Sequence, residues 1–415
     1  MTRPSILILG AGAAGIGAGM ALAAKGVSFE ILEAKDRVGG RAFTDAASLP
    51  SPWDHGCAWL HCADENPLVA EAERVGAEIL RQERIDHFLI HKDGRFLSDA
   101  EADGARRALS HAFEAIEAEA ARGEDGPVAS LLDAASPFQA ETRSILSIIS
   151  ADEPERLSLA GEADYRDTGV NWLPLGGYGA LMARLAAPLP IRLSTPVRRV
   201  AQTAEGVAVD TDVGRLTADA VLVTASTGVL LDGAVEIGPG PAREALTLMS
   251  AAPLGAYEKI AVALRRNPVE DPRKIFCWIS TPDQPPSDVQ IQPGEPTLMI
   301  FHIGGDAARR IAALPADARG RWAVDRLAHA FGEALREEVI GTATTDWGAD
   351  PFIRGAYSHV VPGRAQDRRD LIGLETGRIA FAGEALSLRA QGTCHGAWLS
   401  GQAVAARLAE AVRPA

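Results

Sequence analysis

The 415-residue sequence has few cysteines, no excess of positive charge and no long hydrophobic run. Its four cysteines (Cys57, Cys62, Cys277 and Cys394) are scattered and form no CxxC pair, which excludes a disulfide framework. The 41 basic and 55 acidic residues give a net charge of -14, so no basic surface for nucleic acid or anionic lipid is expected. No apolar run reaches the ~18 residues that a membrane span needs. We therefore expect a cytoplasmic protein that binds neither nucleic acid nor a membrane.

Other catalytic patterns are also absent. The nine histidines are dispersed without metal-ligand spacing, and no Ser-His-Asp order stands out, so no metal site is expected. Hydrophobic residues make up 47% and charged residues 23% of the chain, which is typical of a globular protein with a large core. At roughly 150 residues per domain, the length predicts two to three domains.

The first 35 residues carry the pattern of a dinucleotide-binding unit. An apolar strand at 5–9 is followed by GAGAAG at 10–15, a small-residue helix at 16–25 and a second strand at 28–32. Gly10 would allow the tight turn, Gly12 would let the backbone approach a pyrophosphate, and Gly15 would let helix and strand pack closely. The helix N-terminus then faces the phosphates.

The residues that follow bear on which dinucleotide is bound. Glu33, at the end of the second strand, can accept hydrogen bonds from ribose hydroxyls, and an acid here argues against the 2′-phosphate of NADP. The sequence RVGGR at 37–41 places Arg37 and Arg41 beside two glycines, a combination that suits further phosphate contacts.

This N-terminal block resembles the FAD-binding signature of the flavin-containing amine oxidase superfamily, in which an R-x-G-G-R element follows the dinucleotide motif. The polyamine-oxidase-like and bacterial flavin monoamine oxidase branch resembles it best. Further similar segments follow in the same order along the chain: DHGCAWLH at 54–61, LGGYGAL at 175–181, TPVRRV at 195–200, ADAVLVT at 218–224, PLGAYEK at 253–259, DPFIRGAY at 350–357, FAGE at 381–384 and GTCHGA at 392–397.

The resemblance implies an α/β fold with an FAD-binding Rossmann-like domain of the glutathione-reductase type and an inserted α+β substrate domain. The FAD-binding domain would be discontinuous, formed by residues 1–62, 172–250 and 353–415, and the substrate domain by 63–171 and 251–352. Within the latter, a capping box at Ser98 and Glu101 predicts a helix that ends near Gly123. A second amphipathic stretch covers 321–338, and 281–287 is expected to be a proline-stiffened surface loop.

The resemblance also implies the chemistry. Lys259 corresponds to the family's catalytic lysine, which holds a water against the flavin N5 atom. The expected reaction removes a hydride equivalent from the carbon next to the nitrogen of an amine, gives an imine and then a carbonyl, and reduces O2 to H2O2. FAD would be non-covalent, because Ala356 occupies the position of the cysteine that attaches flavin in monoamine oxidases.

Three residues are candidates for the substrate pocket. Tyr357 corresponds to one aromatic wall beside the flavin, and Thr393 replaces the opposite aromatic wall. His61 is either a pocket base or hydrogen-bonding group, or a buried histidine without such a role.

The implied cofactor contacts are Gly10, Gly12, Ala14, Gly15, Glu33, Ala34, Arg37, Gly39, Gly40, Arg41, Ala58, Trp59, Val197, Trp347, Gly383, Glu384, Thr393 and Cys394.

Two other functions remain open at this stage. One is a related flavin dehydrogenase or desaturase of the protoporphyrinogen or carotenoid type, and the other is a flavin-binding partner protein without turnover. The sequence does not distinguish among amines, between O2 and another electron acceptor, or between a monomer and a homodimer.

Overall fold

The structure is a computed structural model that describes residues 4–81, 88–281, 284–292, 294 and 296–412. A five-stranded parallel sheet forms around the two apolar strands that the N-terminal sequence predicts. β1 pairs in parallel with β2 on one side and with β14 on the other. In spatial order the sheet contains β10 (Ile191–Arg192), β2 (Phe29–Leu32), β1 (Ile6–Leu9), β14 (Ala220–Val223) and β21 (Ile379–Phe381).

Alternate side chains of β1 enter two different cores, as expected for a parallel strand covered on both faces. Ile6 and Ile8 pack in the core that contains α1 (Ala13–Ala24) and α13 (Cys394–Val412). Leu7 and Leu9 pack in the core shared with a four-stranded sheet and α8. That second sheet contains β13 (Gly214–Ala218), β12 (Gly206–Thr211), β11 (Val197–Thr203) and β15 (Glu236–Ile237). The other helices of this half are α6 (Tyr178–Ala186), α7 (Thr227–Leu231), α8 (Pro241–Met249), α12 (Ala365–Gly373) and the short η3 (Glu384–Leu386).

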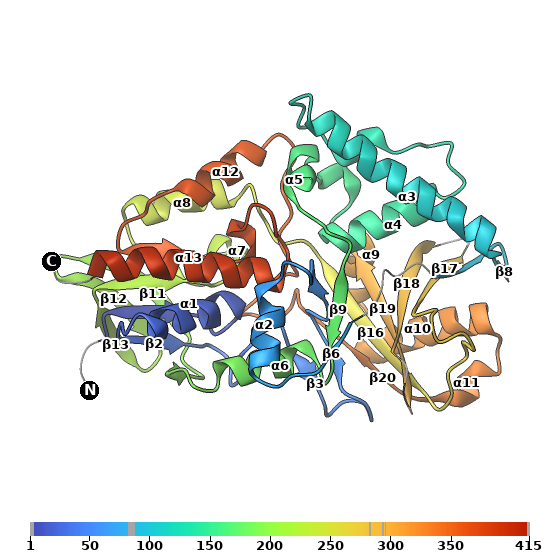
Figure 1. Cartoon of the computed structure of the whole chain (residues 1–415), viewed down its shortest axis with the longest axis horizontal. Helices are drawn as coiled ribbons and strands as arrows, with labels where there is room; N and C mark the ends of the chain where they lie inside the picture. The colour runs from blue at the N-terminus through green and yellow to red at the C-terminus, as the bar shows by residue number, and fades with distance from the viewer. Residues whose placement is uncertain (1–3, 82–87, 282–283, 293, 295, 413–415) are drawn as a thin grey trace.

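A mixed seven-stranded sheet forms the other half of the molecule (Figure 1). Its order is β20 (Val339–Thr344), β16 (Tyr257–Leu264), β19 (Thr297–Gly304), β18 (Gln284–Gln292), β17 (Phe276–Thr281), β7 (Phe88–Lys92) and β8 (Arg95–Phe96). Ile260, Val262 and Leu264 of β16 pack in the core with α9 (Gly305–Ala312) and α10 (Ala316–Phe331). Because strand side chains alternate, Tyr257 and Lys259 point to the opposite face.

The described residues also form further helices and short sheets. The helices are α2 (Pro67–Arg74), α3 (Asp99–Ala120), η1 (Val128–Leu131), α4 (Gln139–Ser150), η2 (Pro154–Arg156), α5 (Leu159–Asp164) and α11 (Leu335–Glu338). The short sheets pair β3 (Thr44–Asp45) with β4 (Trp53–Asp54), and β9 (Asn171–Pro174) with β5 (Leu60–His61) and β6 (Ile79–Leu80). Each helix in the described ranges is too short or too polar to span a bilayer.

The predicted helix after Ser98 is α3, with the capping box formed, but two other expectations need correction. The stretch at 321–338 is not one helix: α10 ends at Phe331, and Gly332, with φ of +94°, separates it from α11. Residues 284–287, expected in a surface loop, begin β18; 282–283 lie outside the described residues. The strand tolerates Pro285 and Pro286 because this end pairs only with β17, beyond the end of the β18–β19 pairing. The domain boundaries stay a prediction.

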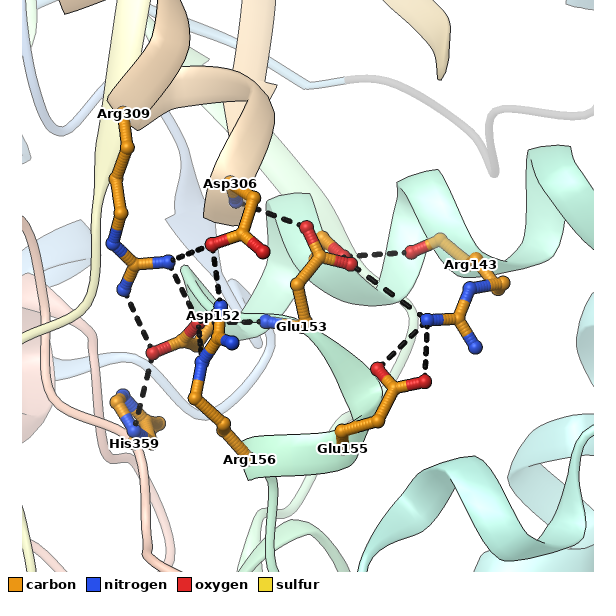
Figure 2. Close-up of polar contacts among 9 residues, drawn as sticks. Arg143, Asp152, Glu153, Glu155, Arg156, Asp306, Arg309 and His359 are labelled. Atoms are coloured by element: carbon orange, nitrogen blue, oxygen red, sulfur yellow. Dashed lines mark hydrogen bonds and ion pairs between the residues drawn. The ribbon is translucent and has the colours of Figure 1, made fainter.

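A charged network ties α4, η2 and α9 together (Figure 2). The buried Asp152 carboxylate accepts hydrogen bonds from Arg156 Nε at 2.7 Å and from Arg309 Nη2 at 2.9 Å. His359 Nε2 lies 3.6 Å from the same group. Burial acts to raise the pKa of Asp152, but the hydrogen bonds from Arg309 and Arg156 lower it to about 2. The network therefore joins the segment after α4 to α9 and to the chain beside Tyr357.

The contact between α1 and α13 yields a prediction. An added Cβ at the buried Gly401 would lie 2.0 Å from the carbonyl oxygen of Ala14. Alanine is favoured over glycine in a helix by about 1 kcal/mol, but here we expect Gly401→Ala to lower the free energy of unfolding by about 1–3 kcal/mol through overpacking. Urea denaturation measures the change.

Gly373→Ala is the matched control, because a Cβ at this position in α12 would meet no atom within 4 Å. It should leave stability unchanged or slightly higher. A Gly401→Ala variant as stable as the wild type would contradict the close contact of the two helices.

Candidate active site

One cavity of about 1240 Å³ lies between the carboxyl ends of the parallel strands β1 and β2 and the cavity-facing side of the seven-stranded sheet. Ligands of open α/β folds bind at this end of the strands. All of the predicted site residues line the cavity except Gly15 and Arg37. The structure thus brings residues from both ends of the sequence to one place.

The glycine-rich turn after β1 forms one wall. Gly10 has φ of +105°, a conformation that favours glycine. A Cβ at Gly12 would meet no atom within 4 Å, so this backbone faces open space in the cavity, as does Ala14. Gly15 lies outside the lining, because a Cβ there would be 1.9 Å from the carbonyl oxygen of Gly10. Its predicted part in close packing therefore agrees with the geometry, whereas a direct cofactor contact does not.

Glu33 holds the turn in place. Its carboxylate accepts hydrogen bonds from the backbone N–H of Ala11 at 2.7 Å and of Lys35 at 2.9 Å. Burial raises the pKa of Glu33, opposed by these two hydrogen bonds. Each carboxylate oxygen keeps a lone pair for a ribose hydroxyl. Ala34 and Val197 line the cavity next to Glu33.

The backbone at Gly39 and Gly40 lies against the glycine-rich turn that follows β1. Gly39 N–H donates to the carbonyl oxygen of Ala11 at 2.8 Å, and Gly40 has φ of +57°. Arg37 does not line the cavity, so the phosphate contact expected of it is not supported. Its guanidinium instead donates to the carbonyl of Gly40 at 2.9 Å and lies 4.1 Å from the ring centroid of Phe43.

An ion pair between Arg41 and Glu384 joins two segments that lie far apart in the sequence. Arg41 Nη1 lies 2.9 Å from Glu384 Oε1, and it also donates to the carbonyl of Ala356. Glu384 accepts further hydrogen bonds from Ser358 Oγ at 2.6 Å and Gly392 N–H at 3.0 Å. Burial alone would raise the pKa of Glu384, but Arg41 and Ser358 outweigh it and lower it. This carboxylate is therefore charged and holds the cavity wall together.

The start of α13 closes this wall. Thr393 Oγ1 accepts from the N–H of Gly396 at 3.0 Å and donates to the carbonyl of Ala390 at 2.7 Å. Thr393 lines the cavity, but its hydroxyl proton is donated to the Ala390 carbonyl and its oxygen caps α13, which weakens the expectation that it contacts substrate. Cys394 and Gly383 also line the cavity.

Lys259 is only 2% exposed, and its Nζ points into the cavity wall. It donates to the carbonyls of Asp54 at 3.0 Å and Gly56 at 2.8 Å, which leaves one of its three N–H bonds for a ligand or water. Burial lowers the pKa of Lys259 to about 8, opposed by the nearby Asp54 and Cys57. The group can therefore exist as an ammonium or an amine near neutral pH.

The carboxylate of Glu258, on the opposite face of β16, positions Trp347. The backbone N–H of Trp347 donates to Glu258 Oε1 at 3.0 Å, and its indole N–H donates to the carbonyl of His55 at 3.2 Å. Trp59 stacks on Phe276 with ring centroids 6.0 Å apart, and Ala58 lines the cavity beside it.

Tyr357 and His61 both line the cavity. The Tyr357 ring lies 5.5 Å from that of Tyr257, and its hydroxyl donates to the carbonyl of Ile148. His61 Nδ1 donates to Asn171 Oδ1 at 2.7 Å, since an amide oxygen can only accept, so Nε2 is left as an acceptor. Burial lowers the pKa of His61 and favours this neutral form.

Several cavity residues were not predicted, among them Tyr257, Phe276, Asp288, His302 and Glu162. Tyr257 lies within the PLGAYEK segment, and its alternation with Lys259 could have indicated it. The others lie on strands or helices whose pairing is not local, so no signal in the sequence places them together.

The donor set of this cavity fits a dinucleotide. It combines open backbone at Gly12, a carboxylate at the end of β2 and a helix N-terminus that directs free N–H groups at one point. The same cavity is also lined by Lys259 and by the aromatic rings of Trp59, Tyr257, Phe276 and Tyr357.

The chain belongs to the family described as flavin containing amine oxidoreductase, whose sequence profile matches residues 13–163 and 160–409. It is therefore an FAD-dependent oxidoreductase that acts on amines, and the predicted fold class is confirmed. Family membership does not support the desaturase or non-catalytic alternatives.

Individual relatives cover almost the whole chain. Probable polyamine oxidase 4 of Arabidopsis thaliana is 27% identical over 96% of this chain and 86% of its own length. Polyamine oxidase 4 of Oryza sativa subsp. japonica is 28% identical over 97% and 88%. Among solved structures, cyclohexylamine oxidase from Brevibacterium oxydans matches with a TM-score of 0.84 at 22% identity, covering 99% of both chains. Putrescine oxidase bound to putrescine matches with a TM-score of 0.81 at 18% identity, covering 98% and 99%.

The non-covalent state of the cofactor stays a prediction that can be checked. Ala356 is buried in the cavity wall and offers no nucleophile. Acid precipitation of the purified protein should therefore release all of the flavin into the supernatant, measured by its absorbance. Flavin that remains with the washed polypeptide would contradict the prediction and would direct attention to Cys57 and Cys394, the cysteines that line the cavity.

Proposed function

We propose that this enzyme oxidises a primary or secondary amine to an imine, which water hydrolyses to a carbonyl compound, while O2 is reduced to H2O2. Bound FAD would supply the electron acceptor, taking a hydride equivalent from the carbon next to the nitrogen. The observation that carries the proposal is that Lys259 and these aromatic rings line the same cavity as the backbone and carboxylate groups that fit a dinucleotide.

The residues of this chain would bind and orient the amine. Tyr357 and Tyr257 offer aromatic faces, which attract a cation or an amine. The buried walls exclude water and hold the reacting C–H bond in one orientation.

The proposed role of Lys259 is to hold a water and provide positive charge. Its ammonium is fixed by two backbone carbonyls, so little reorganisation is needed when negative charge develops nearby. This fits the reaction with O2, in which the positive charge stabilises the reduced oxygen. The ion pair between Arg41 and Glu384 would keep the cavity wall rigid during the reaction.

Anaerobic mixing with a panel of amines tests the proposed reaction. Linear, cyclic and aromatic amines and a diamine are added to the FAD-loaded protein, and the visible absorbance of oxidised flavin is followed. We expect at least one amine to bleach the flavin, and O2 then to restore the absorbance with one H2O2 per turnover. FAD-replete protein that no amine bleaches would contradict the proposal.

Lys259→Met tests the role of the lysine. We expect FAD to remain bound and the reoxidation of dithionite-reduced flavin by O2 to slow by about 10²–10³-fold, as for loss of one well-placed donor. Because the pKa of Lys259 is lowered to about 8, the wild-type rate should fall as pH rises through that value, whereas the variant should show no such fall. Stopped-flow spectroscopy measures both.

Lys25→Met, at the exposed end of α1, is the control and should behave as the wild type. Wild-type rates and pH dependence in Lys259→Met would remove the lysine from the mechanism.

A further inference from the structure

Two cysteines from opposite ends of the chain meet in the cavity wall. Cys57 lies between β4 and β5, and Cys394 is the first residue of α13. Both line the cavity, and both pack in the core that contains α1 and α13. A hydrogen bond joins their two side chains, and Cys394 Sγ also lies 3.9 Å from Met182 Sδ. A disulfide needs two cysteines whose side chains already face each other, and this pair of free thiols meets that condition.

The two thiols differ in acidity. The hydrogen bond from Cys394 lowers the pKa of Cys57, Arg41 and Lys259 act in the same direction, and burial opposes them. The same hydrogen bond, together with burial, raises the pKa of Cys394 well above its usual value. Because the thiolate and not the thiol is the nucleophile, Cys57 is the sulfur that reacts first, and Cys394 is its protonated partner.

The other two cysteines do not share this environment. All four cysteines lie in the described ranges, and neither Cys62 nor Cys277 lines the cavity. The Cys62 thiol donates to the carbonyl of Arg166 at 3.3 Å, and Cys277 is fully buried in the core of the seven-stranded sheet. Burial raises the pKa of both. They are therefore internal controls for the reactivity of Cys57.

We propose that Cys57 and Cys394 form a redox-active pair that H2O2 converts into a disulfide. The Cys57 thiolate attacks one oxygen of the peroxide, the O–O bond breaks, and the products are a sulfenic acid at Cys57 and hydroxide. Cys394 then attacks the Cys57 sulfur and forms the S–S bond, while its proton leaves with the hydroxyl group as water. Two electrons pass from the sulfurs to the peroxide.

The disulfide would act on a segment that is important for the site. The carbonyls of Asp54 and Gly56, on either side of the Cys57 region, hold the ammonium of Lys259. The new bond would tie this segment covalently to the start of α13, and a reducing thiol would release it. H2O2 is the product of the proposed reaction and would arise in the same cavity. The assignment of the pair does not depend on that reaction, because added H2O2 tests it directly.

Peroxide treatment of the FAD-loaded protein is the test. After H2O2 is added and removed, the thiols are titrated under denaturing conditions, and peptides are analysed by mass spectrometry without reduction. We expect the loss of two of the four thiols, a mass loss of two hydrogen atoms and a peptide that links Cys57 to Cys394. Dithiothreitol should restore both thiols. Cys57 should be oxidised at least about 10-fold faster than Cys62 or Cys277, because thiolate character governs the rate.

Single variants separate the two roles. In Cys394→Ser no thiol attacks the sulfenic acid, so dimedone should trap it at Cys57. Cys57→Ser should give neither a disulfide nor dimedone labelling of Cys394. Cys62→Ser is the matched control: its hydroxyl can keep the hydrogen bond to Arg166, and the disulfide should form as in the wild type.

Four free thiols in peroxide-treated wild type would overturn the proposal, as would a disulfide between other cysteines or oxidation of Cys62 and Cys277 at the rate of Cys57. Dimedone labelling of Cys394 in Cys57→Ser would contradict the assigned order of reaction. None of these results bears on the oxidation of amines, which fails separately if no amine bleaches the flavin.

Discussion

The burial of one ammonium group constrains the geometry of the whole site. Lys259 belongs to the seven-stranded sheet, whereas the carbonyls of Asp54 and Gly56 that hold it belong to the segment that leaves the dinucleotide-binding elements. A buried charge without partners costs several kcal/mol, so these two parts must keep their relative position. The contact therefore fixes where the two halves meet, and the cavity forms at that junction.

Carboxylates divide the cavity into two chemically different parts. Glu33 and Glu384 have their oxygens engaged by backbone N–H groups or by Arg41, so they act as fixed elements of the cofactor wall. Asp288 and Glu162 each keep one buried oxygen without a partner. Glu33 and Glu384 therefore stabilise the cavity wall, whereas Asp288 and Glu162 can each accept one more hydrogen bond.

Local patterns in the sequence predict the cofactor half well. The strand, glycines, helix and Glu33 follow one another within 33 residues, so the turn and the β1–β2 pairing are formed by residues close together in the sequence. Lys259 could be predicted as a catalytic residue only because the preceding PLG segment at 253–255 resembles that of the family. Arg37 was assigned to phosphate because a sequence cannot show that Phe43 and the Gly40 carbonyl engage its guanidinium. Asp288 was not predicted as a cavity residue. Its position near Lys259 depends on the pairing of β18 with β19 and of β19 with β16, which a local sequence pattern does not reveal.

A crystal structure of the FAD-loaded enzyme tests the central claim most directly. The account predicts the ribose next to Glu33, the pyrophosphate over Gly12, and the flavin ring within one water molecule of Lys259 Nζ, with the aromatic part of the cavity open on its other side. A flavin ring remote from Lys259, or a Lys259 side chain turned out of the cavity when FAD is bound, would contradict it.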